Sequence, residues 1–295
     1  MAKIILAGGS GFIGHYLHKK FTSEGHQVLI ISRNKEQGHI DWNDHKALLD
    51  ALEGSWILIN LAGKSVNCRH TEENKKAILE SRTRTTAPLN ELVRKCSQPP
   101  QFWFNASGAA YYKSSEDKVM TETDYEPGTS FMAEVSAQWE QALFAHELYH
   151  TKRIAMRTAI VLGKGDGPLK PLSTLAKTGL GGTQGSGRQM VSWIHIEDYY
   201  QIIRFLAEKG DIDGPVNFSA PEPVTNTVFM KTLRQTVGMP LGLPAPEFAI
   251  RIGASIIGTE ADLLLDSSYV TSERLHNAGF TFRHGTLADA LKDLL

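Results

Sequence analysis

The feature that most constrains this chain is a glycine cluster between an apolar segment and an amphipathic one, close to the first residue. The apolar segment is Lys3 to Ala7 (KIILA), which is typical of a short buried β-strand. Residues 12 to 24 follow with apolar side chains at helical spacing. Glycines recur at every third position from the end of the first segment into the second: Gly8, Gly11 and Gly14. A strand, a glycine turn and a helix in this order predict a site for the pyrophosphate of a dinucleotide.

Each of the three glycines has a physical reason in such a site. Gly8 permits the tight turn, Gly11 lets the backbone approach the pyrophosphate, and Gly14 lets the helix pack close to the strand. The phosphates then meet free N–H groups and the positive end of the helix dipole. Glycines used only for turning are the weaker interpretation, because the flanking strand and helix are both predicted. The predicted ligands in the loop are Gly8, Ser10, Gly11, Phe12, Ile13 and Gly14.

The end of the next apolar strand, Gln27 to Ser32, bears on which dinucleotide binds. An NAD site usually places Asp or Glu about 20 residues after the glycine loop, where it holds the ribose 2′-hydroxyl. This chain has Ser32-Arg33-Asn34 there. A guanidinium offers a planar fork of donors to phosphate oxygens. NADP is therefore predicted over NAD, with a solvated arginine after a strand as the alternative.

The rest of the chain repeats the strand–helix pattern. Near-continuous apolar segments recur at Trp56–Leu61, Phe102–Ala106, Ile154–Leu162 and Pro215–Ala220. Helical patterns are predicted for residues 72–96 and 131–148. Apolar strands separated by helices are typical of a parallel sheet covered on both faces. We expect an α/β fold with a Rossmann-type doubly wound sheet, whose ligands bind outside the carboxyl ends of the strands.

The pattern changes after Leu162. A loose glycine-rich stretch is predicted from Gly163 to Gly187, and its last part, Gly179 to Gly187, is either a loop that closes over a ligand or a flexible connector. From Pro221 onward the chain is mainly helical. We therefore predict an NADP-binding domain (residues 1–165 and 190–220) and a smaller substrate-binding subdomain (residues 166–189 and 221–295). His195 is expected to be hydrogen-bonded inside the fold, with orientation of the substrate as the alternative.

The composition excludes several classes of protein. The 295 residues include 31 Lys and Arg against 32 Asp and Glu, a formal net charge of −1, so no long-range field gathers nucleic acid or an anionic membrane. Two cysteines, Cys68 and Cys96, cannot form a disulfide framework. No apolar run has the length of a signal peptide or a membrane span. A cytoplasmic protein with a small-molecule substrate, and without a nucleic-acid or membrane partner, is predicted.

One motif points to a different chemistry. Residues 146–150, HELYH, match the His-Glu-x-x-His signature of zinc peptidases. A zinc peptidase also needs a third ligand, but the chain continues as Thr151-Lys152-Arg153 into a predicted strand. Near the end of the helix predicted for residues 131–148, His146 and His150 stand where partial positive charge is favourable. We predict no metal site.

Several motifs in order resemble those of the extended short-chain dehydrogenase/reductase superfamily, and more narrowly its atypical "epimerase family" branch. Members of this branch resemble nucleotide-sugar epimerases and carry a C-terminal domain of unknown function. The motifs are AGGSGFIGHYL, ISRN, NLAG, ESRTRTT, NASGAAYY and the tail AGFTFRHGTLADALKDLL. The resemblance covers nearly the whole chain. Besides the loop, it implies these NADP-binding residues: Ser32, Arg33, Leu61, Ala62, Gly63, Arg82 and Val161.

The departure from the superfamily concerns catalysis. Active members use Tyr-x-x-x-Lys, in which the tyrosine transfers a proton and the lysine lowers its pKa. The corresponding segment here, Ser130 to Glu140, contains neither residue type. Ser107 stands at the position of the superfamily's serine, and Tyr111 and Tyr112 follow it.

Two interpretations stay open. The first is an NADP-dependent oxidoreductase or nucleotide-sugar-epimerase-like enzyme acting on an unknown carbonyl or hydroxyl substrate. In it, Tyr111 or Tyr112 supplies the proton and Ser107 polarises the carbonyl. The second is a non-catalytic NADP(H)-binding sensor or scaffold. By analogy alone, a homodimer would form through the helices of residues 72–96 and 131–148.

Overall fold

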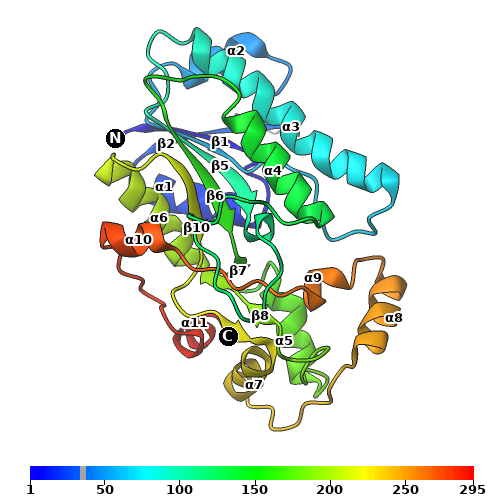
Figure 1. Cartoon of the computed structure of the whole chain (residues 1–295). Helices are drawn as coiled ribbons and strands as arrows, with labels where there is room; N and C mark the ends of the chain where they lie inside the picture. The colour runs from blue at the N-terminus through cyan, green and yellow to red at the C-terminus, as the bar shows by residue number, and fades with distance from the viewer. Residues whose placement is uncertain (34–37) are drawn as a thin grey trace.

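A seven-stranded sheet forms the centre of the computed structural model, which describes residues 1–33 and 38–295 (Figure 1). The strand order is β10-β6-β5-β4-β1-β2-β3, and every neighbouring pair is parallel. The strands are β1 (Lys3–Ala7), β2 (Gln27–Ser32), β3 (Ile40–Asp41), β4 (Ile57–Asn60), β5 (Phe102–Gly108), β6 (Lys152–Thr158) and β10 (Gly214–Phe218). The order reverses beside β1, which lies between β2 and β4. Such a reversal is where open α/β sheets bind their ligands.

Helices cover both faces of the sheet, because alternate side chains of its strands point to opposite sides. On one face, Ile4 and Leu6 pack with α1 (Phe12–Ser23) and α6 (Ile196–Lys209). On the other, Ile5 and Ala7 belong to the core that is covered by three helices. These are α2 (His45–Leu52), α3 (Glu72–Lys95) and α4 (Phe131–Leu143). The predicted doubly wound α/β fold is confirmed.

A second, mainly helical part lies beyond the carboxyl ends of the strands (Figure 1). It has its own core, which includes Leu162, Trp193, Phe229 and Leu291. Two short strand pairs cross it: β7 (Ile160–Leu162) beside β9 (Trp193–His195), and β8 (Met190–Val191) beside β11 (Val224–Thr225). Its helices are α5 (Leu169–Lys177), α7 (Asn226–Thr236), α8 (Glu247–Ile257), α9 (Asp262–Leu265) and α11 (Leu287–Leu294). α10 (Glu273–Ala278) returns to the main sheet, where Leu275 joins the core beside β10. A short 3-10 turn, η1 (Ala109–Tyr111), follows β5.

Three predicted boundaries are wrong. The helix expected to reach Leu148 ends at Leu143, because Arg153 from β6 donates to the carbonyl oxygens of Leu143 and His146 and turns the chain there. The strand expected over 154–162 is divided, since β7 leaves the main sheet to pair with β9. The stretch from Gly163 to Gly187 is not uniformly loose, because α5 forms within it.

None of the helices in residues 1–33 and 38–295 combines the length and the apolar character that a bilayer crossing requires.

Candidate cofactor and active site

The glycine turn between β1 and α1 is shaped by close backbone contacts. Gly8 has φ +78°, and a Cβ atom there would lie 2.7 Å from the backbone nitrogen of Ala62. A Cβ at Gly14 would lie 2.7 Å from the backbone of Gly9. Both positions therefore require glycine. Gly11 differs, since a Cβ there would meet no atom within 4 Å. The space above Gly11 is open, as a bound pyrophosphate requires.

The first turn of α1 presents its N–H groups without a side-chain cap. α2, α3, α4, α6 and α7 each begin with a side chain that accepts a backbone N–H. α1 begins at Gly11 with no such bond and no acidic residue in its first turn. The free N–H groups of a helix start favour an anion. Phe12 closes one side of this turn, because a Cβ at Gly163 would lie 2.3 Å from its ring. Ser10 is exposed, Ile13 is half-buried, and Val161 is buried in β7.

Arg82 is a half-buried cation beside the segment that follows β4. A Cβ at Gly63 would lie 3.1 Å from the guanidinium carbon of Arg82. The Nη1 atom donates to the carbonyl oxygens of Lys64 (3.0 Å) and Ile78 (2.9 Å). No carboxylate of the described residues lies within salt-bridge distance of it. Burial lowers the pKa of Arg82 to about 10, so the group is still charged at neutral pH and suits an anionic ligand.

The end of β2 places Ser32 and Arg33 at the same edge of the sheet. Ser32 is buried and Arg33 is exposed. β2 runs parallel to β1, with Ile31 opposite Ala7, so Arg33 follows its strand at the level of the glycine turn. Asn34, the third residue of the predicted motif, lies outside the described residues.

The hydroxyl groups of Ser107 and Tyr112 belong to a buried polar network, and the Tyr111 hydroxyl is bonded to the backbone beside it. Ser107 Oγ donates to Glu140 Oε1 at 2.7 Å. Tyr111 donates to the carbonyl oxygen of Tyr125 at 2.6 Å. Tyr112 donates to Asn217 Oδ1 at 2.8 Å. The structure therefore brings the three predicted catalytic residues close to one another, but each hydroxyl proton already has an acceptor inside the protein.

Arg157 of β6 is the centre of that network. Its guanidinium makes two hydrogen bonds of 2.9 Å to the Glu140 carboxylate, donates to the Tyr112 hydroxyl at 2.8 Å, and lies 3.5 Å from the ring centroid of Tyr111. Burial raises the pKa of Tyr112 to about 12, although the Arg157 cation opposes the shift. Tyr112 is therefore protonated at neutral pH.

Sequence reasoning missed Glu140, Arg157 and Asn217. The available signal was a charged residue inside an apolar strand segment, since Arg157 lies in RIAMRTAIVL. A buried arginine must find partners.

The comparisons with known proteins match this architecture. Residues 4–218 match the NAD-dependent epimerase/dehydratase family. The chain belongs to this family. Residues 245–294 match a domain of unknown function, DUF1731. The resemblance to the epimerase branch with such a C-terminal domain is thereby confirmed.

Individual relatives span the whole chain. The epimerase family protein YfhF of Bacillus subtilis is 34 % identical, with 99 % of this chain and 97 % of that protein covered. The crystal structure of human epimerase family protein SDR39U1 (isoform 2) with NADPH superimposes with a TM-score of 0.90 at 31 % identity, covering 99 % of this chain and 98 % of that one. UDP-N-acetylglucosamine 4-epimerase of Bacillus cereus, at 14 % identity and a TM-score of 0.74, covers 100 % of this chain and 98 % of that one; it shows a shared fold.

The zinc-peptidase motif of this epimerase-family chain does not form a zinc-peptidase site. His146 and His150 follow the end of α4 and do not lie on a helix. The His146 ring lies 3.0 Å from the Glu91 carboxylate instead. The paired histidines on one helical face that the motif requires are absent from this described segment.

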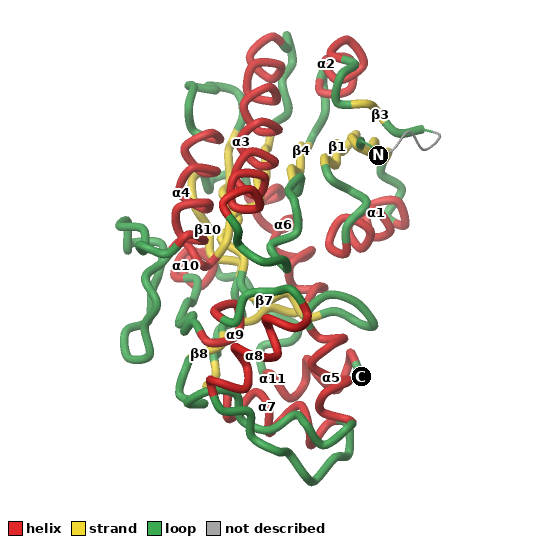
Figure 2. The backbone as a smooth tube through the Cα atoms, turned by 90° about the vertical axis from the view of Figure 1, so that its right-hand side faces the viewer, coloured by secondary structure: helices red, strands yellow, loops and turns green. Residues whose placement is uncertain are grey.

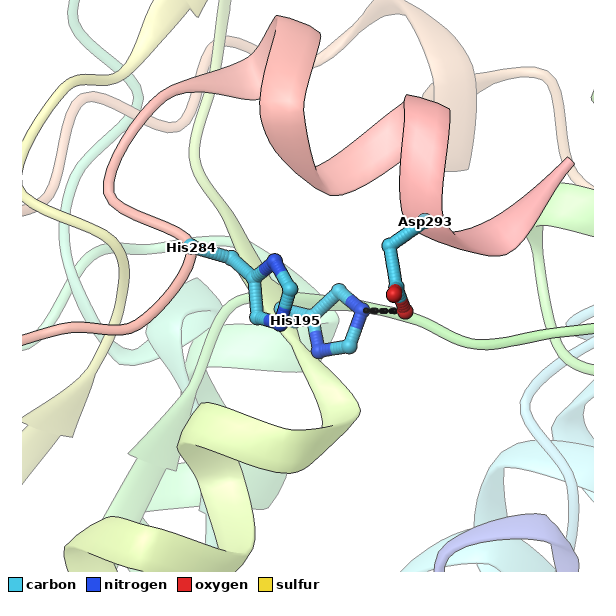
Figure 3. A group of neighbouring side chains, drawn as sticks. All are labelled: His195, His284 and Asp293. Carbon is cyan, nitrogen blue, oxygen red and sulfur yellow. Dashed lines mark ion pairs between the residues drawn. The ribbon is translucent and has the colours of Figure 1, made fainter.

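A different group of three potential metal ligands lies where α6 meets the C-terminal helix: His195, His284 and Asp293 (Figure 3). His195 Nδ1 accepts the backbone N–H of Glu197 at 3.0 Å, so the proton of the neutral ring is on Nε2. Asp293 lies 3.3 Å from that Nε2. A metal ion would need the Nε2 lone pair. His195 is thus the cap of α6. This role fixes a tautomer that disfavours metal binding at Nε2.

Burial of His195 predicts a pH-dependent stability. Burial and the stacked ring of His284 lower the pKa of His195 to about 4, against the opposing effect of Asp293. In the unfolded chain the His195 ring takes up a proton near pH 6.5, whereas in the folded protein it stays neutral down to about pH 4. Acid therefore favours the unfolded chain, and the free energy of unfolding decreases as the pH falls from 6.5 to 4. We expect a loss of about 2–3 kcal/mol over that interval.

Urea unfolding at a series of pH values measures this loss. The variant His195→Asn keeps a capping acceptor for Glu197 and should flatten the pH profile between 6.5 and 4. His150→Asn, at an exposed position, is the matched control and should keep the wild-type slope. An unchanged slope in His195→Asn would contradict the assignment.

Proposed function

We propose that this protein binds NADP(H) at the carboxyl edge of its sheet and uses it to reduce or oxidise a small carbonyl or hydroxyl substrate. The observation that carries the proposal is the convergence of three anion-seeking groups at that edge. These are the uncapped start of α1, the exposed Arg33, and the half-buried Arg82 beside Gly63. The NADPH in the human relative's structure supports it.

The described residues fit such a cofactor. The turn at Gly8 and Gly14 leaves no room for side chains, whereas the space above Gly11 is open. Leu61, Ala62 and Gly63 follow β4 and lie against the glycine turn and Arg82. The small residues Ala62 and Gly63 would let a flat ligand approach the backbone there. Arg33 would bind the 2′-phosphate as a planar fork of donors. When bound, the nicotinamide would supply or accept the hydride.

Tyr112 is our candidate for the proton donor. It is neutral at pH 7, since its pKa is about 12. Arg157, at 2.8 Å, would stabilise the tyrosinate that remains after proton transfer. In this proposal Ser107 polarises the substrate carbonyl, and Tyr111 supports the site through its contact with Arg157.

The domain division, the homodimer and the cytoplasmic location stay predictions.

A second candidate is a non-catalytic NADP(H)-binding protein. It is favoured by two observations: α4 contains neither Tyr nor Lys, and all three candidate hydroxyl groups donate to internal acceptors. Such a protein would report cofactor state to a partner rather than turn over a substrate.

The cofactor preference is tested at Arg33. Arg33→Asp should weaken NADPH binding about 10- to 100-fold, because a charge-assisted contact to phosphate becomes a repulsion. NADH binding should be kept or improved. Thermal-shift titration with both cofactors measures this, since a ligand that binds only the folded state raises its stability. Arg94→Asp, an equal charge change at the far end of α3, is the control. Equal affinity of the wild type for NADH and NADPH would refute the NADP assignment.

Turnover separates the two candidates. Absorbance of bound NADPH is followed with a panel of small carbonyl compounds and nucleotide sugars. We expect Tyr112→Phe to lose at least about 100-fold in rate with NADPH affinity intact, because the proton donor is removed. Tyr111→Phe should lose less, since its hydroxyl contacts a backbone carbonyl. No turnover by the wild type across the panel would favour the non-catalytic candidate.

A further inference from the structure

Residues 246–266, called the strap below, connect two firmly bonded points of the C-terminal part and carry α8 and α9. At one end, Ala245 exchanges backbone hydrogen bonds with Thr183 and Gly185 at 2.9 and 2.8 Å. At the other, Ser268 donates to the Met190 carbonyl at 2.9 Å. Figure 2 shows α8 and α9 between the lower end of α3 and α7. The strap is therefore held at both ends, and its bonding partners at both ends belong to the second, mainly helical part of the molecule.

The body of the strap has very little apolar packing. Its core consists of Ile250, Ala254 and Ala261, joined by the partly buried Ala245 and Leu265. Four large apolar side chains of α8 are exposed instead: Phe248, Ile252, Ile256 and Ile257. A segment with so few buried contacts opens at a low cost in free energy compared with the sheet and its helices.

Four hydrogen bonds of 2.5–2.6 Å join the strap to the loop between β4 and α3. We call this set the latch. Its members are Arg69 bonded twice to Ser255, the His70 backbone N–H bonded to Glu260, and Thr259 bonded to Asn67. Most of these groups are exposed, so water competes for them when they separate.

The loop that the latch holds is the one that borders the proposed cofactor site. It begins at Ala62, which lies against Gly8, and continues through Gly63 and Lys64, which contact Arg82. It ends at Thr71, the cap of α3. The strap is therefore hydrogen-bonded to the middle of this loop. The beginning of the same loop forms one wall of the proposed cofactor site.

We propose that the strap is a gate for NADP(H), closed by the latch and opened by its rupture. This inference rests on the proposed cofactor binding. The cofactor passes in and out when the latch is broken, and is retained between the sheet edge and the strap when it is formed. Gating of this kind restricts exchange of a ligand with solvent.

The gate has a kinetic signature that a cofactor contact lacks. If uptake and release both pass through the open state, a weaker latch raises both rates by the same factor and leaves Kd unchanged. Loss of a direct contact with NADPH raises the dissociation rate alone, because most affinity changes appear there.

Stopped-flow fluorescence of NADPH tests this with Arg69→Ala and Thr259→Val. We expect both rate constants to rise about fivefold or more, with Kd within about twofold of the wild type. Arg84→Ala removes an exposed arginine of α3 that is paired with Glu80 and should leave both rates unchanged. A rise in the dissociation rate alone, or unchanged rates in both latch variants, would overturn the gate.

A covalent latch gives the opposite result. Asn67→Cys and Thr259→Cys are combined with Cys68→Ser and Cys96→Ser, and the two new thiols are joined directly as a disulfide by mild oxidation. NADPH bound before crosslinking should be retained through dialysis, and NADPH added afterwards should fail to bind. Free exchange after complete crosslinking would refute the gate while leaving NADPH binding in place. A wild type that binds no NADPH would remove the proposed function and the gate together.

Discussion

Gly11→Ala should abolish high-affinity NADPH binding without unfolding the protein. Gly11 has φ −87°, which alanine adopts readily, and the new Cβ would meet no atom within 4 Å. The space that the methyl group enters is where the pyrophosphate must approach the backbone. We expect Kd for NADPH to rise at least about 100-fold. The free energy of unfolding should stay within about 1 kcal/mol of the wild type, because the lower entropy of the unfolded chain offsets a poorer helix cap.

Gly8→Ala is the contrasting variant for this prediction. Its φ of +78° and the 2.7 Å approach to Ala62 make any side chain strained, so this variant should lose stability as well as affinity. Isothermal titration with NADPH and urea unfolding, performed on both variants, separate the two effects. Wild-type affinity in Gly11→Ala would show that the pyrophosphate does not lie over Gly11.

Arg157→Met should produce the largest loss of stability from a single side chain. It leaves the Glu140 carboxylate buried without its cation, and it removes the donor to Tyr112. Breaking a buried ion pair by removing one partner costs about 3–5 kcal/mol. For a chain of 295 residues, we expect Tm to fall by about 5–8 °C.

Two further variants make this prediction specific. Arg157→Met with Glu140→Leu should recover much of the loss, because no charge is then left unpaired. Arg84→Met removes the cation of an exposed pair with the same 2.9 Å separation and should cost less than about 1 kcal/mol. Equal losses in Arg157→Met and Arg84→Met, measured by calorimetry, would show that burial does not govern the strength of this pair.

The cofactor edge was predictable because its signals are local in the sequence. The turn from β1 into α1 depends on the backbone freedom of Gly8 and on the apolar spacing of the residues around it. The absence of an acidic residue at the end of β2 is likewise read directly from Ser32-Arg33-Asn34. Each of these features is decided by residues within about one strand and one helix of each other.

The polar network behind Ser107 could not be predicted in the same way. Arg157 contacts Glu140, 17 positions earlier, and Tyr112, 45 positions earlier, and Tyr112 contacts Asn217, 105 positions later. No periodicity links residues at such separations. The predicted end of α4 was wrong for a related reason. The arginine that donates to the carbonyl oxygen of Leu143, Arg153, comes from β6.

The amino-acid sequence by itself determined the doubly wound sheet, the glycine turn at its edge and the absence of the superfamily's Tyr-x-x-x-Lys pair. Those features follow from backbone sterics and from the burial of apolar faces, which act between near neighbours in the chain. Only the tertiary structure decided that the hydroxyl groups of Ser107, Tyr111 and Tyr112 are already bonded and that His195 caps a helix. The same holds for the latch between Asn67 and Thr259. These are pairings of polar groups, and a polar group accepts whichever partner the fold brings within reach.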